Sequence, residues 1–487
     1  MIIKRNGLAT ESIILTFVQC FTYASSFIQV MILSRVFTKL DYGTYSQGNL
    51  IVHFTAPLLL LGLSNAANYF YNQNDANGED TIKKYINTIY VLIASLGAIG
   101  GLLIIFFHNQ IAAYFTNRHL VTIIYIFAFR PLFQNLISFF QVLYVASGRV
   151  RIIAVRNTIV SLVQLVLIVV ACYFLKNVNL VCILLVLTDL IQLLIFHCYF
   201  NKVEWSVKII LPSLTYIKPI LQYALPLALS TAVGTLSIHM DSLLIGRMMG
   251  TEDFAMYSNM AKELPLNLMI ASLTTVIYPK IVNLMAIGEK TRMLHVYKNY
   301  VEFGILSTWI LVCGTIVCGR ELVLVLYSEK YINGLPIFLI YQLVAALRFT
   351  YYGTLLTANG NTKSIFKLAL FSLVCNFALN IFLFYLIGII GPAIATFVTV
   401  LSNGYLQIYK GLKFLNLSLS AVFDFKCITL FIFKTCLIGF FVYCLKPFIE
   451  FMPLFVRLVL IYLTVTGILV LVNKRKLVYF INELNKQ

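Results

Sequence analysis

The sequence predicts an all-α polytopic membrane protein, and three observations support this fold class. Of the 487 residues, 60% are hydrophobic and 11% are charged, whereas a soluble domain has about 25% charged residues. The mean hydropathy is +0.90. Apolar runs of about 20 residues, long enough to cross a bilayer, recur along the whole chain. Because backbone polar groups inside hydrocarbon have to bond within the segment, each run is expected to be a helix.

These runs define fourteen candidate transmembrane spans. In order along the chain, they cover residues 12–34, 45–70, 85–107, 120–145, 152–175, 178–200, 219–246, 255–281, 297–319, 333–357, 364–387, 389–409, 427–447 and 454–473. The start MIIKRNG resembles the basic end of a signal peptide, but the apolar segment behind it is too long and shows no small-residue cleavage site. The first run is therefore expected to remain as an uncleaved helix.

Lysine and arginine are distributed unequally between the loops on the two sides of these spans. Basic residues within four residues of a span end are counted with the adjoining loop. With a cytoplasmic N-terminus, nine of the 36 basic residues then belong to the outer side, four lie deeper inside spans, and the remaining 23 belong to the cytoplasmic side. The four inside spans are Arg130, Lys262, Arg348 and Lys434. Cytoplasmic loops carry the excess of Lys and Arg, so both termini are predicted to be cytoplasmic. Because the basic residues are scattered over many loops, we expect no nucleic-acid partner.

A short charged segment occurs twice, 212 residues apart. The residues Arg35, Asp41, Tyr45 and Ser46 recur as Arg247, Asp253, Tyr257 and Ser258. The segments VASGRVR (145–151) and TANGNTK (357–363) match at the same offset. Two matches at one offset indicate an internal duplication. Six spans fit inside the offset, and because six is even, both copies are expected to have the same orientation in the membrane.

The duplication predicts two helical lobes. We expect a six-helix lobe over 1–200, a cytoplasmic linker over 201–218, a second six-helix lobe over 219–412, and two further helices with a cytoplasmic tail over 413–487.

Each repeated segment is interpreted as the outer turn between the first two helices of a lobe, where Gly43 helps the chain to reverse. Two roles stay open for Arg35 and Arg247, one structural and one in contact with substrate.

Several of these segments together resemble a known family. They are SRVFTKLDYGTYS, the loop ASGR after the fourth span, and LPLALSTAVGTLSIHMDSLLIGRMMGTEDFAMYS. The full length of the chain resembles the polysaccharide-transporter branch of the multidrug/oligosaccharidyl-lipid/polysaccharide (MOP) exporter superfamily, and most closely its Wzx-type flippases.

The resemblance implies a MATE/MurJ-like architecture in the bacterial cytoplasmic (inner) membrane. It implies flipping of undecaprenyl-diphosphate-linked oligosaccharide repeat units, by alternating access between two lobes, for O-antigen, capsule or exopolysaccharide biosynthesis. The partners that it implies are the lipid-linked oligosaccharide and membrane lipid, with a polysaccharide polymerase and a chain-length regulator as candidate partner proteins.

Two arginines lie deep inside predicted spans. Arg130 and Arg348 are each about 10 residues from a span end, or roughly 15 Å at 1.5 Å per residue. A charge at that depth costs about 2.5–3.5 kcal/mol or more, so it is expected to face a cavity or a partner. The forked donors of arginine suit a diphosphate. We therefore interpret both as cations of a substrate cavity, with a structural ion pair as the alternative.

A charged pair is expected near the outer ends of the seventh and eighth spans. Asp241 and Lys262 lie at similar depths, roughly 9 and 10 Å below the outer surface. Their pairing would be either a static salt bridge or part of a gate. Two further intramembrane carboxylates, Glu263 and Asp189, are candidates for coupling transport to protons or Na⁺. Pro265 predicts a kink in the eighth span.

Other functions remain as alternatives. A lipid II flippase has a similar cargo, and a MATE-type drug or cation antiporter belongs to the same superfamily. A membrane enzyme, such as a polysaccharide polymerase or a transferase, would need a catalytic constellation, and no paired outer carboxylates or loop histidine stand out. No phosphate-binding loop, metal-spaced histidine cluster or C-x-x-C pair occurs. We expect no enzyme activity, no metal and no cofactor.

Overall fold

The computed structural model describes residues 5–72, 78–208 and 213–486, and within these ranges the protein consists of helices and loops without strands. Ten helices are long and apolar enough to cross a membrane, or up to eleven if a bent pair counts as one span. The all-α polytopic fold class is therefore confirmed. One of the ten is a 53-residue stretch, Thr362–Phe414, which reverses at Gly388 into two helices that pack side by side. The number of fourteen spans stays a prediction.

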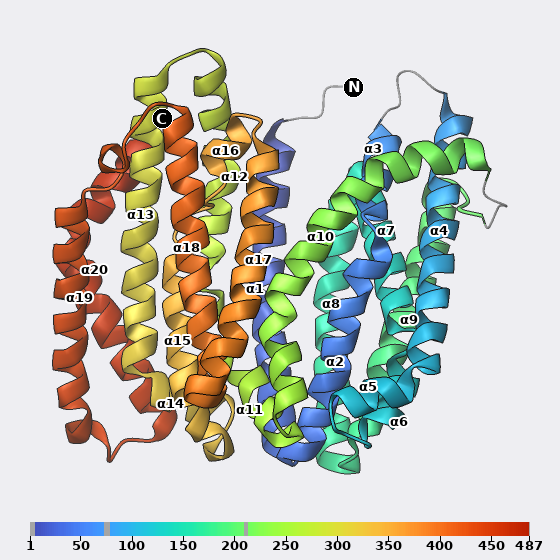
Figure 1. Ribbon diagram of the computed structural model, residues 1–487, viewed down its shortest axis with the longest axis horizontal. Helices are drawn as coiled ribbons and strands as arrows, with labels where there is room; N and C mark the ends of the chain where they lie inside the picture. Colours follow the sequence, from blue (N-terminus) through green and yellow to red (C-terminus); the bar gives the residue numbers. More distant parts are fainter. Residues whose placement is uncertain (1–4, 73–77, 209–212, 487) are drawn as a thin grey trace. The chain divides into compact units, whose positions relative to one another are not determined.

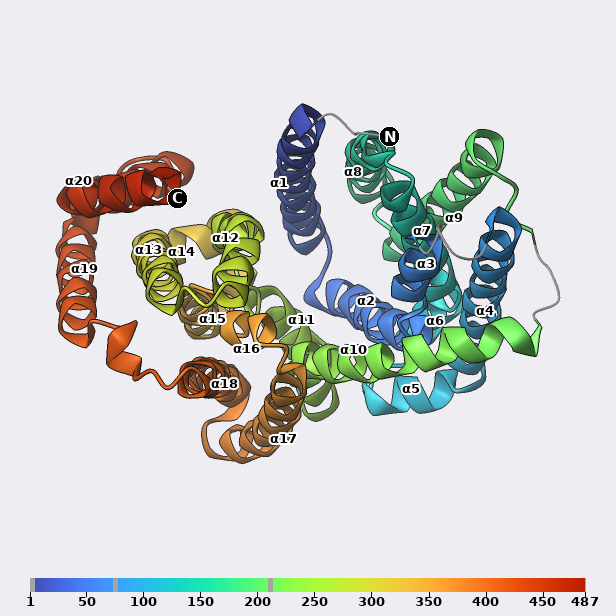
Figure 2. The same cartoon turned by 90° about the horizontal axis from the view of Figure 1, so that it is seen from above.

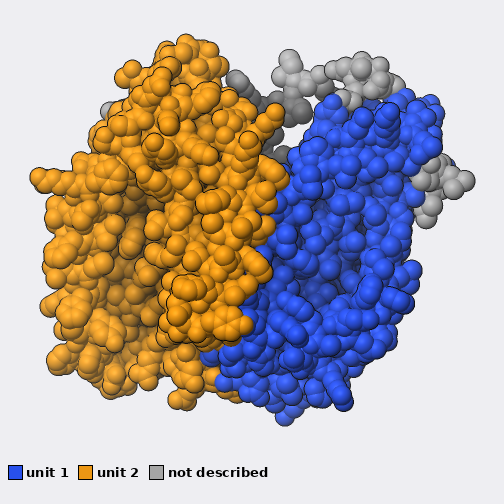
Figure 3. Space-filling model, viewed as in Figure 1, with its two compact units in different colours: residues 1–256 blue, residues 257–487 orange. Residues whose placement is uncertain are grey.

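Packing divides the chain into two compact units, residues 1–256 and 257–487 (Figure 3). The helices of the first unit are α1 (Arg5–Val36), α2 (Lys39–Leu60), α3 (Leu63–Asn72), α4 (Glu79–Phe106), α5 (His108–Tyr114), α6 (Leu120–Phe127), α7 (Arg130–Ala146), α8 (Val150–Val170), α9 (Val178–Val203) and α10 (Leu214–Met248). A π-helical turn, η1 (Ala171–Leu175), extends α8. Helix α11 (Thr251–Met260) lies across the boundary between the units.

In the first unit, α2 is the central helix. It packs against α4, α6, α7, α9 and α10, while α1 packs mainly along α8. A hydrophobic core fills the space among α3, α4, α7 and α9, and its fully buried side chains include Ile86, Ile89, Phe139, Phe140 and Phe200. Close packing of such buried side chains supplies dispersion contacts that hold helices together in lipid.

The second unit contains the C-terminal helices. They are α12 (Leu268–Ala286), α13 (Lys290–Val317), α14 (Gly319–Leu326), α15 (Leu335–Leu347), α16 (Thr354–Ala358), α17 (Thr362–Ile387), α18 (Gly391–Phe414), α19 (Phe425–Leu445) and α20 (Leu454–Lys486). Helix α13 is the most enclosed of them and packs on α12, α15, α19 and α20. The α17–α18 hairpin joins this unit through α18, which packs on α15 and α16 (Figures 1 and 2).

The internal duplication is supported by the positions at which helices begin and end. Three pairs of bounds recur with the offset of 212 residues: the ends of α1 and α10 at Val36 and Met248, the starts of α2 and α11 at Lys39 and Thr251, and the ends of α7 and α16 at Ala146 and Ala358. The matching loops also share their backbone geometry, because Gly148 and Gly360 have φ angles of 74° and 70°. Both glycines therefore occupy the left-handed region that favours this residue.

The repeat and the packing of the helices place the boundary between the two lobes differently. The repeat begins its second copy with α10, whereas packing groups α10 with the first unit, where it contacts α2, α3 and α4. The predicted linker, 201–218, includes residues 209–212, which lie outside the described residues. The predicted division into lobes, linker and tail therefore stays a prediction.

The interpretation of Gly43 is wrong. The reversal between the first two helices occurs at Phe37 and Thr38, and Gly43 lies inside α2, where it is buried. A Cβ atom on Gly43 would overlap the carbonyl oxygen of Thr251. This glycine is therefore needed for the close approach of two helices. The reversal itself is stabilised by Thr38, whose hydroxyl accepts a hydrogen bond from the backbone N–H of Asp41 at 3.1 Å.

Candidate substrate site

The helical structure of the second unit is interrupted twice. Between α11 and α12, residues 261–267 leave the α-helix and include the short 3₁₀ turn η2 (Pro265–Asn267). Between α15 and α16, residues 348–353 do the same. Irregular backbone of this kind is tolerated at membrane depth only where it is buried in protein or lines a cavity. In transporters such breaks often form binding sites.

A glutamine side chain forms hydrogen bonds with backbone groups at the first break. The Gln342 side chain, on α15, is fully buried. Its Nε2 donates to the carbonyl oxygen of Lys262 at 3.1 Å, and its Oε1 accepts from the backbone N–H of Leu264 at 3.5 Å. Because these groups have lost their helical partners, the glutamine replaces two hydrogen bonds that the break removes. It thereby attaches the broken segment to α15.

An ion pair connects the two breaks. The Nε atom of Arg348 lies 2.9 Å from the Glu263 carboxylate. The Arg348 side chain is 48% exposed and that of Glu263 is 23% exposed. Both residues were predicted as site residues, Arg348 as a cavity cation and Glu263 as a coupling carboxylate, but their pairing was not foreseen. The structure therefore supplies Arg348 with both features that the sequence left as alternatives, a partner and access to open space.

Arg348 lines a cavity of about 590 Å³. The other lining residues are Ile270, Ala271, Thr274, Thr275 and Tyr278 from α12, Thr350 and Tyr351 from the break, and Thr357 from α16. Arg348 is the charged residue among them. Thr350 is 6% exposed, and its hydroxyl is buried without a hydrogen-bond partner among the described residues. Buried polar groups normally have partners, so this hydroxyl would gain a hydrogen bond if a rearrangement of the break exposed it to a ligand.

Helix α13 holds the α15–α16 break in place. A Cβ atom on Gly304 would overlap the carbonyl oxygen of Phe349, so the absence of a side chain lets the break lie directly on α13. The hydroxyl of Tyr300 accepts from the backbone N–H of Tyr351 at 3.3 Å. Tyr300 also shares a 2.6 Å hydrogen bond with Thr274 of α12. These contacts orient the segment that carries Arg348.

The other deep arginine, Arg130, is enclosed. It begins α7 immediately after the break between α6 and α7. Its Nε lies 2.9 Å from Asp189 Oδ2, and both side chains are 8% exposed. Its Nη1 donates to Asn49 Oδ1 at 2.8 Å, and its guanidinium lies 4.9 Å from the centre of the Phe127 ring. This geometry is that of a structural ion pair, the alternative that the sequence left open, and it uses the predicted coupling residue Asp189.

Sequence reasoning missed a second arginine near Asp189. Arg156 was counted among the cytoplasmic loops, although it lies in the second turn of α8. Its Nε donates to Gln192 Oε1 at 3.1 Å and its Nη1 to Asn157 Oδ1 at 2.7 Å. Its guanidinium also lies 5.3 Å from the centre of the Phe196 ring. The signal in the sequence was its position four residues inside the predicted span 152–175.

The two arginines of the repeated segment lie at helix ends. Arg247, near the end of α10, donates from Nη1 to the carbonyl oxygens of Ala113 at 3.2 Å and Tyr114 at 3.4 Å. These are the last carbonyls of α5, where a cation is favourable. Arg35 is an exposed residue in the last turn of α1. Contact of either arginine with substrate stays a prediction.

The proposed pair of Asp241 and Lys262 involves both units. Asp241 is buried in α10, in the first unit, and Lys262 is partly buried at the break between α11 and α12, in the second. Their pairing therefore stays a prediction.

Comparison with known proteins places this chain in a family. A family model described as polysaccharide biosynthesis protein matches residues 32–336, which is more than half of the 487 residues. The chain belongs to this family. A curated relative of this polysaccharide biosynthesis protein is the capsular polysaccharide biosynthesis protein CapF of Staphylococcus aureus. It is 23% identical over 393 residues, which cover 79% of the chain and 94% of CapF.

Solved structures share the fold of this polysaccharide biosynthesis protein. The lipid II flippase MurJ in an inward closed conformation aligns with a TM-score of 0.72 at 14% identity, covering 96% of the chain and 100% of MurJ. An inward-facing MATE-family multidrug transporter of the MOP superfamily aligns with a TM-score of 0.67 at 13% identity, covering 81% and 94%. The predicted MATE/MurJ-like fold is thereby confirmed.

Proposed function

We propose that this protein flips undecaprenyl-diphosphate-linked oligosaccharide repeat units across the bacterial cytoplasmic membrane, for the synthesis of capsule, O-antigen or exopolysaccharide. Membership of the polysaccharide biosynthesis family supports the pathway, and the MOP-type fold supports transport. The observation that carries the proposal is the cavity of about 590 Å³ at the α15–α16 break, where a half-exposed arginine lies beside hydroxyl groups and tyrosine rings.

The chemistry of the cavity fits a phosphate-linked sugar. Arg348 presents forked donors that bind two phosphate oxygens at once. The hydroxyl of Thr350 is a donor and acceptor without a partner among the described residues. The rings of Tyr278 and Tyr351 offer apolar faces with a polar edge, which suit a sugar ring. A purely apolar drug would displace water from the half-exposed guanidinium without offering it an acceptor, which is costly.

The Arg348–Glu263 ion pair links cargo binding to a change at the two helix breaks. Glu263 and a diphosphate compete for the same guanidinium, so cargo binding releases Glu263 from Arg348. Because Glu263 belongs to the α11–α12 break and Arg348 to the α15–α16 break, exchange of partners frees one broken helix from the other. Breaks of this kind act as hinges in alternating access.

Coupling to an ion is part of the proposal. A released Glu263 carboxylate is able to take up a proton or Na⁺, which would tie the return of the empty transporter to an ion gradient. The protein acts as a transporter without enzyme activity or cofactor, with both termini in the cytoplasm. A polymerase and a chain-length regulator use its product on the outer side.

The test is transport by an Arg348→Ala variant. In a strain that lacks the chromosomal copy, we expect Arg348→Ala to abolish surface polysaccharide and to accumulate lipid-linked repeat units, while the protein reaches the membrane in normal amounts. Arg348→Lys should restore only part of the activity, since lysine lacks the fork. Arg292→Ala is the matched control, because Arg292 is an exposed arginine of the same unit that pairs with Glu289. Normal glycan from Arg348→Ala at normal abundance would remove Arg348 from the site.

A lipid II flippase is the second candidate, favoured by the alignment over the whole of MurJ. The two functions are separated by complementation. Rescue of a strain depleted of its own lipid II flippase, without effect on surface polysaccharide, would replace the first proposal with the second.

A further inference from the structure

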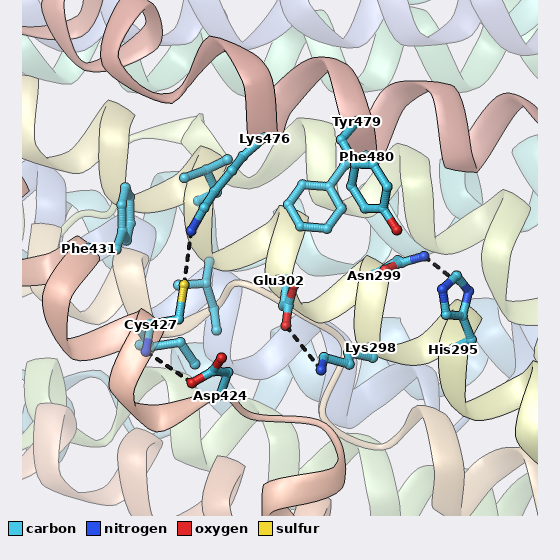
Figure 4. A pocket seen from close by; sticks show the side chains of 13 residues that line it. His295, Lys298, Asn299, Glu302, Asp424, Cys427, Phe431, Lys476, Tyr479 and Phe480 are labelled. Atoms are coloured by element: carbon cyan, nitrogen blue, oxygen red, sulfur yellow. Dashed lines mark hydrogen bonds and ion pairs between the residues drawn. The ribbon is translucent and has the colours of Figure 1, made fainter.

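A second cavity of about 410 Å³ lies in the C-terminal unit, and it shares no lining residue with the cavity of Arg348 (Figure 4). It is enclosed by the first half of α13, the start of α19 and the end of α20, three helices that pack on one another. Its volume lies in the range of ligand-binding pockets, about 300–1,000 Å³. The function proposed above uses none of its residues.

The lining of this cavity changes from polar to apolar along α13 and α19. Its charged residues are Lys298 and Glu302 on α13, Asp424 at the start of α19, and Lys476 near the end of α20. The apolar residues Ile305 and Leu306, Ile428 and Phe431 follow one or two turns further into α13 and α19. A membrane lipid has the same order of chemical groups, because its charged headgroup is followed by hydrocarbon chains.

The charged groups of the cavity have weak or distant hydrogen-bond and ion-pair partners. The ammonium group of Lys476 donates to the sulfur of Cys427 at 2.9 Å (Figure 4), and a thiol is a weak acceptor. Lys298 lies 3.8 Å from the Glu302 carboxylate, beyond an ordinary hydrogen bond. Asp424 uses Oδ1 to cap α19 through the backbone N–H of Cys427 at 3.0 Å. Cations and carboxylates therefore face one space with bonding capacity left over.

We propose that this cavity binds the headgroup of a zwitterionic membrane phospholipid that carries a primary ammonium group, as phosphatidylethanolamine does. The phosphate lies between Lys298 and Lys476, and the ammonium group lies against Glu302 and Asp424. One acyl chain follows Ile305 and Phe431. Two cations and two carboxylates line the cavity, so a ligand with both charges satisfies all four, whereas a purely anionic headgroup meets two like charges.

Such a lipid would join α19 and α20 to α13. Its headgroup contacts all three helices at once, so that its binding stabilises their packing in the same way as any ligand that binds only the folded state. The lipid here is a resident component of the transporter and is distinct from the cargo.

The test measures lipid retention by the purified full-length protein. Native mass spectrometry would compare phosphatidylethanolamine, phosphatidylcholine and phosphatidylglycerol with identical acyl chains. We expect phosphatidylethanolamine to bind best. Phosphatidylcholine replaces the N–H donors with methyl groups, and phosphatidylglycerol lacks the cation, so each should bind about tenfold more weakly, the effect of one lost hydrogen bond to a charged group.

Variants of the lining residues test whether the lipid binds in this cavity. Lys476→Gln and Glu302→Gln should each lower the retention of phosphatidylethanolamine by about tenfold. Lys474→Gln is the matched control, because Lys474 is an exposed lysine on α20 outside the cavity lining and its replacement should change nothing. Equal or better binding of phosphatidylglycerol, or equal retention by Lys476→Gln and Lys474→Gln, would overturn the proposal.

A second measurement uses the wild-type protein and so does not depend on folding of the variants. Phosphatidylethanolamine with a photoactivatable group near its headgroup should label peptides that contain residues 295–306, 424–431 or 476–480. Labelling confined to other peptides would also overturn the proposal.

Discussion

At the scale of single residues, the two arginines deep inside predicted spans have different surroundings. Arg130 is 7% exposed and bonded to Asp189 and Asn49. Arg348 pairs with Glu263, but about half of its side chain is exposed to a cavity. A paired charge that is fully enclosed mainly maintains structure, because loss of its partner leaves an uncompensated charge. A half-exposed one is able to exchange partners at little cost.

This difference predicts opposite effects for the two carboxylates. Asp189→Ala should lower the free energy of unfolding by about 3–5 kcal/mol, the cost of breaking a buried pair. Thermal unfolding and membrane abundance of the purified and expressed protein measure the effect. The double variant Asp189→Arg with Arg130→Asp should recover part of the abundance. An Asp189→Ala protein as stable as the wild type would show that Arg130 has another partner.

Glu263→Gln should instead leave stability almost unchanged and alter transport. Without Glu263 as a competitor, Arg348 should bind the lipid-linked diphosphate up to about fivefold more tightly, since an exposed ion pair contributes about 1 kcal/mol at most. Release should then become slower, and turnover should fall. Cargo binding to the purified variant, measured beside surface polysaccharide in cells, checks both effects. Weaker binding would contradict the exchange of partners.

At the scale of elements, the position of the α15–α16 break depends on a glycine of α13. Gly304→Ala places a Cβ against the carbonyl oxygen of Phe349. Overpacking of this kind costs about 1–3 kcal/mol, and displacement of the break should also reduce transport. Gly467→Ala on α20 is the matched control, because a Cβ there meets no atom within 4 Å. A transport assay normalised to protein abundance separates the two variants, and equal activity would show that the break tolerates the shift.

A buried carboxylate joins the last two helices, α19 and α20, to the rest of the second unit. Glu321 of α14, 6% exposed, lies 2.8 Å from Lys446 Nζ and 3.6 Å from Arg457 Nε. Lys446 follows α19 and Arg457 belongs to α20, so that one carboxylate connects three elements.

Glu321→Ala leaves two cations without this partner. It should lower the free energy of unfolding by about 3–5 kcal/mol, whereas Glu289→Ala, which removes an exposed pair with Arg292, should cost less than about 1 kcal/mol. Thermal unfolding of both variants measures the difference. Similar melting temperatures would show that α19 and α20 do not depend on this contact.

At the scale of the whole molecule, the charge distribution predicts topology. Because cytoplasmic loops hold 23 basic residues and outer loops nine in the fourteen-span arrangement, a reporter fused after Gln487 should read cytoplasmic. A reporter inserted after Phe451, between α19 and α20, is the control and should read external. An external signal at Gln487 would contradict either the orientation or the even number of spans.

Much of the architecture was predictable because it depends on local composition. Long apolar runs lead to helices wherever they occur, since hydrocarbon leaves the backbone no other way to bond. The duplication was also readable, because Gly148 and Gly360 need the same left-handed backbone in both copies. Depth alone marked Arg130 and Arg348 as residues that need a partner or a cavity.

What the tertiary structure decided is which side chains meet. Arg130 and Asp189 are 59 residues apart in the chain, and Arg348 and Glu263 are 85 apart. Their contacts arise only when α7 packs on α9, and when two helices break and meet on α13. A sequence records that a buried charge is costly, but its partner depends on the rotation and packing of whole helices, which no local pattern contains. For that reason the sequence by itself determined the membrane fold, the repeat and most of the candidate charges, while the tertiary structure decided their partners and the cavity that Arg348 lines.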